Sequence, residues 1–186
     1  MTQNQVSNGL LTITAQRTSP ATWVSGLVDT KSTWTQLYGT FEARIKVPRG
    51  PGLWPAFWSY FAASGIEAEI DAMEICANPV GMNNGNDVTL LHQVMHWTNA
   101  GAAGRNTRTV DLSEDFHVFG VDWRADHISF YLDGVETWRF TDVAHIPNVP
   151  LPLILDLAVG GAWCGPSDAS TPDGSQMLVD WVRARP

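Results

Sequence analysis

Residues 128–140 read ISFYLDGVETWRF, and this stretch decides the fold class. It contains two runs of β-branched and aromatic residues, which are separated only by Asp133 and Gly134. An Asp-Gly pair between two such runs is the sequence signal of a two-residue β-hairpin turn. The stretch therefore predicts two antiparallel strands that are joined by a tight turn.

The rest of the chain repeats this pattern of short strands and turn residues, and no segment has a convincing helical period. We expect further strands at 10–16, 23–31, 38–48, 53–61, 68–76, 88–97, 116–123, 151–160 and 177–184, with loops at 83–86 and 171–174. Regularly spaced short strands favour a two-sheet sandwich or a closed barrel. Nine Trp residues favour a sandwich with one concave, ligand-binding sheet, because Trp is costly to bury fully and stacks well on ligands.

Length and charge narrow the classes of function. The 186 residues predict a single domain over residues 1–186 with a sizeable core. A net charge of −8 and a pI near 4.9 argue against nucleic acid and anionic membranes as partners. No apolar run approaches the roughly 18 residues of a membrane span. Residues 1–11 lack the basic region and apolar core of a signal peptide, so none is expected in this sequence.

The stretch EIDAME at 69–74 places three carboxylates within six residues. In a regular strand Glu69 and Asp71 share a face and Glu74 falls on the other one. A β-bulge at Ala72-Met73 would shift the period by one residue and return Glu74 to the first face. Two Glu side chains in one cleft can then form the nucleophile and acid/base pair of a retaining glycosidase, whose carboxyls lie about 5–5.5 Å apart.

Two other interpretations of the three acids stay open on pattern alone. Solvated edge strands often carry such acids without any function. Carboxylates also suit hard cations, so a lectin-like calcium site is the second alternative.

An aromatic segment precedes the acidic strand in the sequence, and a segment with two histidines follows it. GLWPAFWSYF at 52–61 places Trp54 and Trp58 on one face, where at least one is expected to stack on the apolar face of a sugar ring. In the strand at 88–97, His92 is expected to be structural and His96 to hydrogen-bond substrate. The remaining histidines, His117, His127 and His145, lie near turns and are expected to be structural or solvated.

The two cysteines, Cys76 and Cys164, cannot define a disulfide framework, and no Cys/His cluster has zinc spacing. We expect two semi-buried thiols, with a single bridge as the alternative.

Five stretches together resemble glycoside hydrolase family 16, and more narrowly its laminarinase-type endo-β-1,3-glucanases. They are YGTFEARIKVPRGPGLWPAFW at 38–58, EIDAME at 69–74, FGVDWRADHISFYLDG at 119–134, LILDLAVGGAW at 153–163 and MLVDWVRARP at 177–186. The six-residue E-x-D-x-x-E form is typical of laminarinases, agarases and carrageenases, and the shorter E-x-D-x-E form of lichenases and xyloglucan-active enzymes. The resemblance covers nearly the whole chain from about Gly9.

The resemblance implies an all-β jelly-roll sandwich of two antiparallel sheets with a concave cleft, and a retaining double displacement on β-1,3-glucan of the laminarin type. By position, Glu69 is the nucleophile, Glu74 the acid/base and Asp71 an assisting acid. The residues that match substrate-binding positions are Trp54, Trp58, His96, Trp163 and Arg44. The resemblance also implies an extracellular, monomeric enzyme that acts on a polysaccharide and requires no cofactor.

This chain departs from the family pattern in four places. Family members usually carry a further N-terminal segment, so we expect an open sheet edge or an unusual partner for the C-terminal strand. ASGIEA at 63–68 replaces a Trp-Pro, and Asp156 stands where Asn is common. Many members bind a structural calcium on the convex side, and Asp180 is the candidate ligand here, without its usual N-terminal partners.

Two alternatives to the hydrolase remain at this point. The first is a glycan-binding sandwich without catalysis, against which the intact acid triad argues. The second is a related enzyme that transglycosylates or acts on another β-glucan or a galactan.

Overall fold

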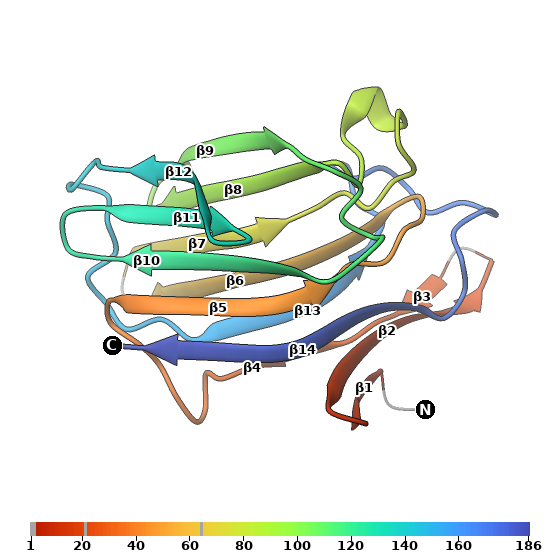
Figure 1. The fold of residues 1–186 in the computed structure, drawn as a ribbon, viewed down its shortest axis with the longest axis horizontal. Helices are drawn as coiled ribbons and strands as arrows, with labels where there is room; N and C mark the ends of the chain where they lie inside the picture. Colours follow the sequence, from red (N-terminus) through yellow and green to blue (C-terminus); the bar gives the residue numbers. More distant parts are fainter. Residues whose placement is uncertain (1–2, 21, 64) are drawn as a thin grey trace.

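The computed structural model describes residues 3–20, 22–63 and 65–186 and is built from two antiparallel β-sheets packed face to face (Figure 1). The eight-stranded sheet has the order β1 (Asn4–Ser7), β2 (Leu10–Ser19), β14 (Ser175–Arg185), β5 (Gly39–Lys46), β10 (His117–Trp123), β11 (Ile128–Leu132) and β12 (Val135–Phe140), with β3 (Thr22–Val24) paired to β2. The six-stranded sheet has the order β4 (Leu27–Asp29), β13 (Leu153–Val159), β6 (Leu53–Ala63), β7 (Ile66–Glu74), β8 (Leu90–Trp97) and β9 (Gly101–Arg108). The predicted jelly-roll sandwich is confirmed.

The hairpin that the sequence predicts at 128–140 is present. Strands β11 and β12 pair antiparallel up to Leu132 and Val135, so only two residues form the turn. Both have positive φ, at 50° for Asp133 and 78° for Gly134, as a type I′ turn requires. The Asp133 carboxylate also accepts a hydrogen bond from the Val118 amide at 2.8 Å, which fixes the turn against β10.

The single strand predicted at 23–31 is wrong, because the structure divides it between the two sheets. Strand β3 pairs with β2, whereas β4 pairs with β13. The chain crosses between the sheets at Gly26, where a Cβ atom would lie 1.9 Å from Asn4 Oδ1. A larger residue there would force the Asn4 side chain to move, and a period-two pattern contains no sign of this close approach.

Two strands were not predicted. Strand β9 has the sequence GAAGRNTR and is largely exposed, and its register with β8 runs without interruption from Leu90 and Arg108 to Trp97 and Gly101. Strand β1 forms the outer edge of its sheet beside β2, and β14 lies between β2 and β5. The C-terminal strand is therefore internal to its sheet, and β1 forms the open edge.

The core lies between the sheets and holds the two layers in register. Alternate residues of β5 are buried, and Phe41 meets Phe57 of the other sheet edge-to-face at 5.6 Å between ring centroids. Removing such a buried ring typically costs about 3–5 kcal/mol of stability. Because one face of each sheet is used in this way, the functional residues must lie on the outer faces.

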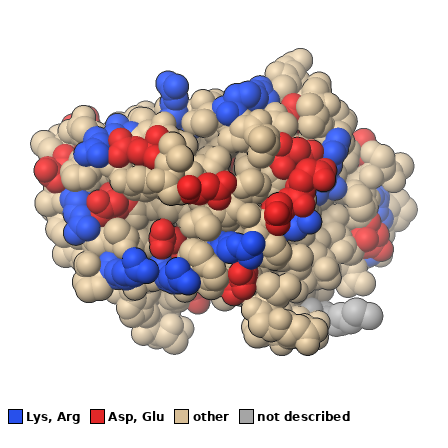
Figure 2. Space-filling view, viewed as in Figure 1, with Lys and Arg blue, Asp and Glu red and all other residues tan. Residues whose placement is uncertain are grey.

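The two outer faces differ in character. Figure 2 views the molecule from the side of the eight-stranded sheet, where acidic and basic side chains are interspersed. The outer face of the six-stranded sheet instead carries a pocket lined by aromatic and acidic residues of β6, β7 and β13. No helix among the described residues is long and apolar enough to cross a membrane.

Candidate active site

Strand β7 contains the β-bulge that the phase of EIDAME predicts. One residue of β8, Gln93, lies opposite two residues of β7, Ala72 and Met73. Both are fully buried in the core. The extra residue turns Glu74 back to the face of the other two acids, and all three line one pocket. The predicted bulge and the shared face are confirmed.

A buried glutamine that sequence reasoning missed holds the bulge. Gln93 is fully buried, and its Nε2 donates a hydrogen bond to the Ala72 carbonyl at 3.3 Å. Its Oε1 accepts a hydrogen bond from Thr137 Oγ1 of the opposite sheet at 2.6 Å. The available signal was a polar residue at a core-facing position, between Leu91 and Met95 of an otherwise apolar face.

We expect Gln93→Leu to lower the free energy of unfolding by about 1–3 kcal/mol, because the buried Ala72 carbonyl loses its side-chain partner. In a domain of this size the melting temperature should fall by about 2–4 °C for each kcal/mol. Thermal unfolding followed by circular dichroism measures the change. The exposed Gln176→Leu is the matched control, and a melting temperature equal to that control would show that Gln93 does not hold the bulge.

The pocket has a volume of about 330 Å³ and an acidic, aromatic lining. Its acids are Glu67, Glu69, Asp71, Glu74 and Asp156, and its aromatic residues are Trp54, Trp58 and Tyr60. No Lys or Arg is among the described residues that line it. Carboxylates crowded in this way repel one another, so they raise one another's pKa and favour protonated forms.

Burial raises the pKa values of Glu69 and Asp71, and a hydrogen bond between the two carboxyls shifts the two values in opposite directions. The pKa of Asp71 is well above its usual range, because the side chain is buried and faces the charges of Glu74 and Glu69. Burial also raises the pKa of Glu69, whereas the hydrogen bond with Asp71 lowers it. The hydrogen bond therefore favours the ionised form of Glu69 and the protonated form of Asp71, while burial keeps the pKa of both above their usual values.

Glu74 has the ionisation that a general acid needs. Burial raises its pKa to about 7, and the charges of Glu69 and Asp156 act in the same direction. The Trp54 indole N–H donates to Glu74 Oε1 at 3.1 Å, which opposes the rise and fixes the carboxyl in place. Glu74 is therefore protonated in weakly acidic solution and can take up or release a proton near neutral pH.

Asp156 faces Glu74 across a small residue. The register places Asp156 opposite Ala56 and Ala56 opposite Glu74, on the adjacent strands β13, β6 and β7. The Trp58 indole N–H donates to Asp156 Oδ1 at 2.8 Å. Burial raises the pKa of Asp156 to about 6, so its charge is present near neutral pH, where Glu74 titrates.

We expect Asp156→Asn to shift the alkaline limb of the pH–activity profile to lower pH, by about one unit at most. Ionised Asp156 raises the pKa of Glu74, so a neutral side chain lets Glu74 lose its proton at lower pH. The amide oxygen of Asn keeps the acceptor for Trp58. The measurement is kcat/KM from pH 4 to 9, with Asp29→Asn of the neighbouring β4 as control. An unchanged or more alkaline limb would contradict this role of Asp156.

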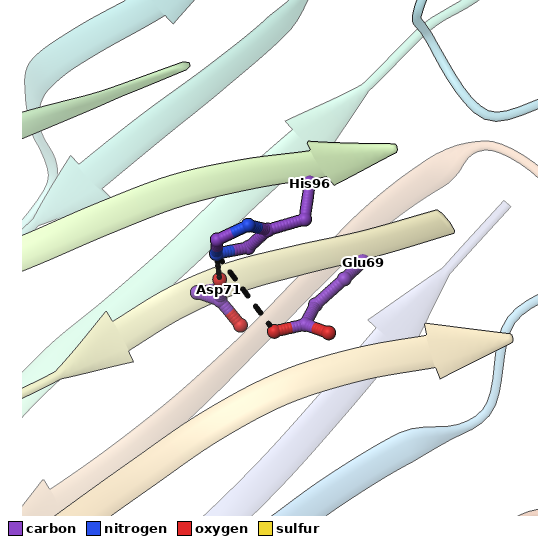
Figure 3. A group of neighbouring side chains, drawn as sticks. All are labelled: Glu69, Asp71 and His96. Carbon is purple, nitrogen blue, oxygen red and sulfur yellow. Dashed lines mark ion pairs between the residues drawn. The ribbon is translucent and has the colours of Figure 1, made fainter. Parts of the chain in front are cut away.

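His96 lies over Glu69 and Asp71, as Figure 3 shows. Its Nε2 is 3.5 Å from Asp71 Oδ2 and 4.0 Å from Glu69 Oε1. Burial lowers the pKa of His96, so the ring is mainly neutral at neutral pH and offers one donor and one acceptor nitrogen. Its place beside the pocket fits the predicted hydrogen bond to substrate, and that bond stays a prediction.

Trp163 and a disulfide form one end of the site. Trp163 packs edge-to-face on Trp54, with ring centroids 4.9 Å apart. The next residue, Cys164, is bonded to Cys76, two positions after Glu74. The expectation of two free thiols is therefore wrong. The bridge ties the Trp163 loop to the end of β7, a connection that two distant cysteines in a sequence do not specify.

The other histidines have protein partners. The ring nitrogens of His92 lie 2.8 Å from Asn86 Oδ1 and 2.9 Å from Asn106 Oδ1, in agreement with its predicted structural role. The three histidines near turns each pair with an Asp carboxylate, as His117–Asp133, His127–Asp126 and His145–Asp142.

Comparison with known proteins identifies the family of this chain. Residues 1–183 match the model of "Glycosyl hydrolases family 16". This chain is a member of that family. It is 32% identical over 189 residues to the endo-1,3-1,4-beta-glycanase ExsH of Rhizobium meliloti (strain 1021), with 96% of this chain and 38% of that protein covered. It thus spans well under half of that relative.

Two further family 16 comparisons cover most of the chain. A glucan endo-1,3-beta-glucosidase of Cryptopygus antarcticus is 34% identical over 184 residues, with 87% of this chain and 66% of that protein covered. The laminarinase catalytic domain of Thermotoga maritima MSB8 superimposes with a TM-score of 0.86 at 28% identity, covering 98% of this chain and 79% of the other. The two-sheet architecture is therefore that of solved family 16 structures.

The position of Arg44 corrects one predicted site residue. Arg44 lies on β5 of the eight-stranded sheet, and its Nη1 donates to Asp180 Oδ2 at 2.8 Å. Its guanidinium also stacks on Phe116, 4.5 Å from the ring centroid. Alternate residues of β5 face the core, so Arg44 points away from both the core and the pocket. The prediction that it reaches substrate is wrong. Asp180, the candidate calcium ligand, is its ion-pair partner.

Five residues of the pocket lining were not among the predicted site residues, and three of them, Tyr60, Glu67 and Asp156, have polar side chains. Glu67 lies two residues before Glu69 on β7 and therefore on the same face of the strand. The pairing of β6 with β7 places Tyr60 opposite Glu69. Burial and, to a smaller extent, the charge of Glu67 raise the pKa values of Glu69 and Tyr60. The period-two pattern held this signal, since Glu67 precedes EIDAME by two residues and Tyr60 follows Trp58 by two.

Proposed function

We propose that this chain is a catalytic domain that hydrolyses β-1,3-glucan of the laminarin type, with internal cleavage and retention of configuration. One observation carries the proposal: the bulge in β7 brings Glu69, Asp71 and Glu74 to one aromatic-lined pocket. The family 16 relatives named above support the substrate class.

In the first step, the Glu69 carboxylate attacks the anomeric carbon while the bond to the leaving oxygen breaks. Glu74 donates its proton to that oxygen, so the leaving group departs as an alcohol. The product is a glycosyl ester of Glu69. Asp71 hydrogen-bonds the Glu69 carboxyl, which orients the nucleophile and disperses its charge.

In the second step, the Glu74 carboxylate accepts a proton from water, and the water oxygen attacks the anomeric carbon. The ester bond to Glu69 breaks, Glu69 leaves as a carboxylate, and Glu74 is protonated again. Two inversions at the same carbon give net retention. The two carboxyl groups perform the nucleophilic attack and the proton transfers, so the proposed reaction requires no cofactor.

The aromatic residues would hold the sugar rings on either side of this chemistry. The indole N–H groups of Trp54 and Trp58 donate hydrogen bonds to Glu74 and Asp156 respectively, so each ring is fixed in the pocket wall. A fixed ring loses little entropy when a sugar stacks on it. Trp163 packs on Trp54 and extends this surface. We propose that His96 hydrogen-bonds a sugar hydroxyl beside the nucleophile.

The proposal includes an extracellular location and a monomeric enzyme. The bond between Cys76 and Cys164 supports the location, because disulfides form and persist mainly in oxidising compartments. Elution volume in size-exclusion chromatography tests the monomer.

A panel of polysaccharides tests the proposed function. We expect reducing ends to be released from laminarin, with oligosaccharides of several lengths among the early products, as internal cleavage gives. Cellulose and agarose serve as linkage controls, and binding to each polymer is measured in parallel. Binding to laminarin without release would favour the non-catalytic alternative. Release from agarose alone would assign a galactan substrate instead.

A further inference from the structure

Glu69, Asp71 and His96 form a cluster whose contacts within the protein are incomplete. One donor atom from each residue lies within 4.8 Å of the other two, and all three side chains converge on one point above β7 and β8 (Figure 3). The Nε2 of His96 is 3.5 Å from Asp71 and 4.0 Å from Glu69. Hydrogen bonds from a ring nitrogen to an oxygen are about 2.7–3.2 Å long, so neither contact is a well-formed hydrogen bond.

The oxygen of Asp71 that faces His96 has no hydrogen-bond partner. Its side chain is 2% exposed, and Oδ2 is buried. Leaving a buried polar oxygen without a partner is unfavourable, and native proteins rarely do so without a functional reason. Of the two residues beside it, His96 is 40% and Glu69 is 22% exposed at the side chain, so a small ligand can enter from the pocket.

The spacing of these atoms suits one metal ion. Two ligands that bind Zn²⁺ at about 2.0–2.2 Å in tetrahedral geometry are separated by about 3.4 Å. The distance from His96 to Asp71 matches this value, and Glu69 needs only a small side-chain rotation. We propose that Glu69, Asp71 and His96 bind a single Zn²⁺ ion in competition with substrate.

The donor set determines the class of cation. Calcium and magnesium prefer oxygen ligands alone, whereas an imidazole nitrogen beside two carboxylates suits zinc and neighbouring transition metals. Three protein ligands leave a fourth position that opens to the pocket, where water completes the coordination. The remaining acids of the pocket, Glu67 and Glu74, add negative charge around the ion.

Bound zinc would block the chemistry at two points. The Glu69 oxygen that coordinates the ion cannot attack an anomeric carbon, and His96 cannot hydrogen-bond a sugar hydroxyl. This inhibitory consequence rests on the proposed function, but the binding of the ion does not. Zinc should therefore raise the apparent KM for laminarin with little change in kcat, and EDTA should reverse the effect.

Equilibrium dialysis against ZnCl₂ in a non-chelating buffer, without substrate, tests the site. We expect one Zn²⁺ per chain in the wild-type protein. His96→Gln and Asp71→Asn should each bind at least about 10-fold more weakly, since loss of even an outer-shell partner costs 10–100-fold. His127→Gln is the matched control, because His127 forms a His–Asp pair with Asp126 at 2.8 Å outside this cluster.

Two results would overturn the site: no saturable binding by the wild-type protein, or binding that both variants retain at wild-type affinity. Full displacement of zinc by an equal concentration of Ca²⁺ would overturn the assignment of the imidazole as a ligand. Because dialysis needs no substrate, these outcomes are distinct from a failure to hydrolyse laminarin.

Discussion

Glu69→Gln should lower the rate of laminarin hydrolysis by roughly 10⁴-fold or more, because an amide cannot form the glycosyl ester on which both steps depend. The pKa of buried Asp71 is well above its usual range, so Asp71 is a poor replacement for the lost nucleophile. Initial rates of reducing-end release measure the effect. Glu42→Gln, on β5 of the opposite sheet, is the matched control and should keep wild-type activity.

The fold of the Glu69→Gln variant should remain intact. Burial and the charge of Glu67 raise the pKa of Glu69, so the ionised side chain is unfavourable in the folded state at neutral pH. A raised carboxyl pKa means that stability is lost as pH rises through the pKa, and a neutral amide avoids this loss. The melting temperature at pH 7 should therefore equal or exceed that of the wild-type protein. Substantial activity in a folded variant would show that Glu69 is not the nucleophile.

Glu74→Gln should lower the rate on laminarin by about 10²–10⁴-fold, the usual contribution of general acid–base catalysis. The loss should depend on the leaving group. The phenolate of an activated aryl β-laminaribioside leaves without protonation. The first step on this substrate should therefore proceed at nearly the wild-type rate in the variant.

Stopped-flow measurement of phenolate release tests this dependence. We expect a rapid burst from the Glu74→Gln variant, followed by slow turnover, because hydrolysis of the ester still lacks its general base. Equal losses on laminarin and on the activated substrate, without a burst, would contradict the assignment of Glu74 as acid/base. The alkaline limb near pH 7 of the wild-type profile should also disappear in this variant, since the pKa of Glu74 is about 7.

Local patterns predicted the parts of the fold that local physics determines. The Asp133-Gly134 turn requires positive φ at both positions, and the chain adopts it there. The phase of EIDAME predicted the bulge, because three acids on a functional face are incompatible with an unbroken period of two. In each case a short stretch contains both the signal and its structural consequence.

Pairings between distant segments could not be predicted in this way. The exposed strand β9 contains Gly, Ala and Asn, which have low strand propensity, and it forms because the edge of β8 supplies backbone partners. The disulfide depends on a loop that returns 88 positions later to the end of β7. Gln93 holds the bulge through Thr137 of the other sheet, a contact that no strand pattern contains.

The site shows the same division between local and distant information. The three acids of EIDAME lie on one strand, and their proposed roles follow from its geometry. Asp156 acts on Glu74 from two strands away, through a register that only the folded sheet defines. Arg44 shows the reverse error, because a resemblance in sequence placed on the substrate side a residue that lies on the other sheet.

The most direct test of the double displacement is the configuration of the first product. Proton NMR of laminarin hydrolysis, recorded within the first minutes and before mutarotation, separates the α and β signals at the newly formed reducing ends. We predict that the β-anomer appears first and that the α-anomer grows only as mutarotation proceeds. Initial appearance of the α-anomer would contradict a glycosyl ester on Glu69, and with it the central mechanism.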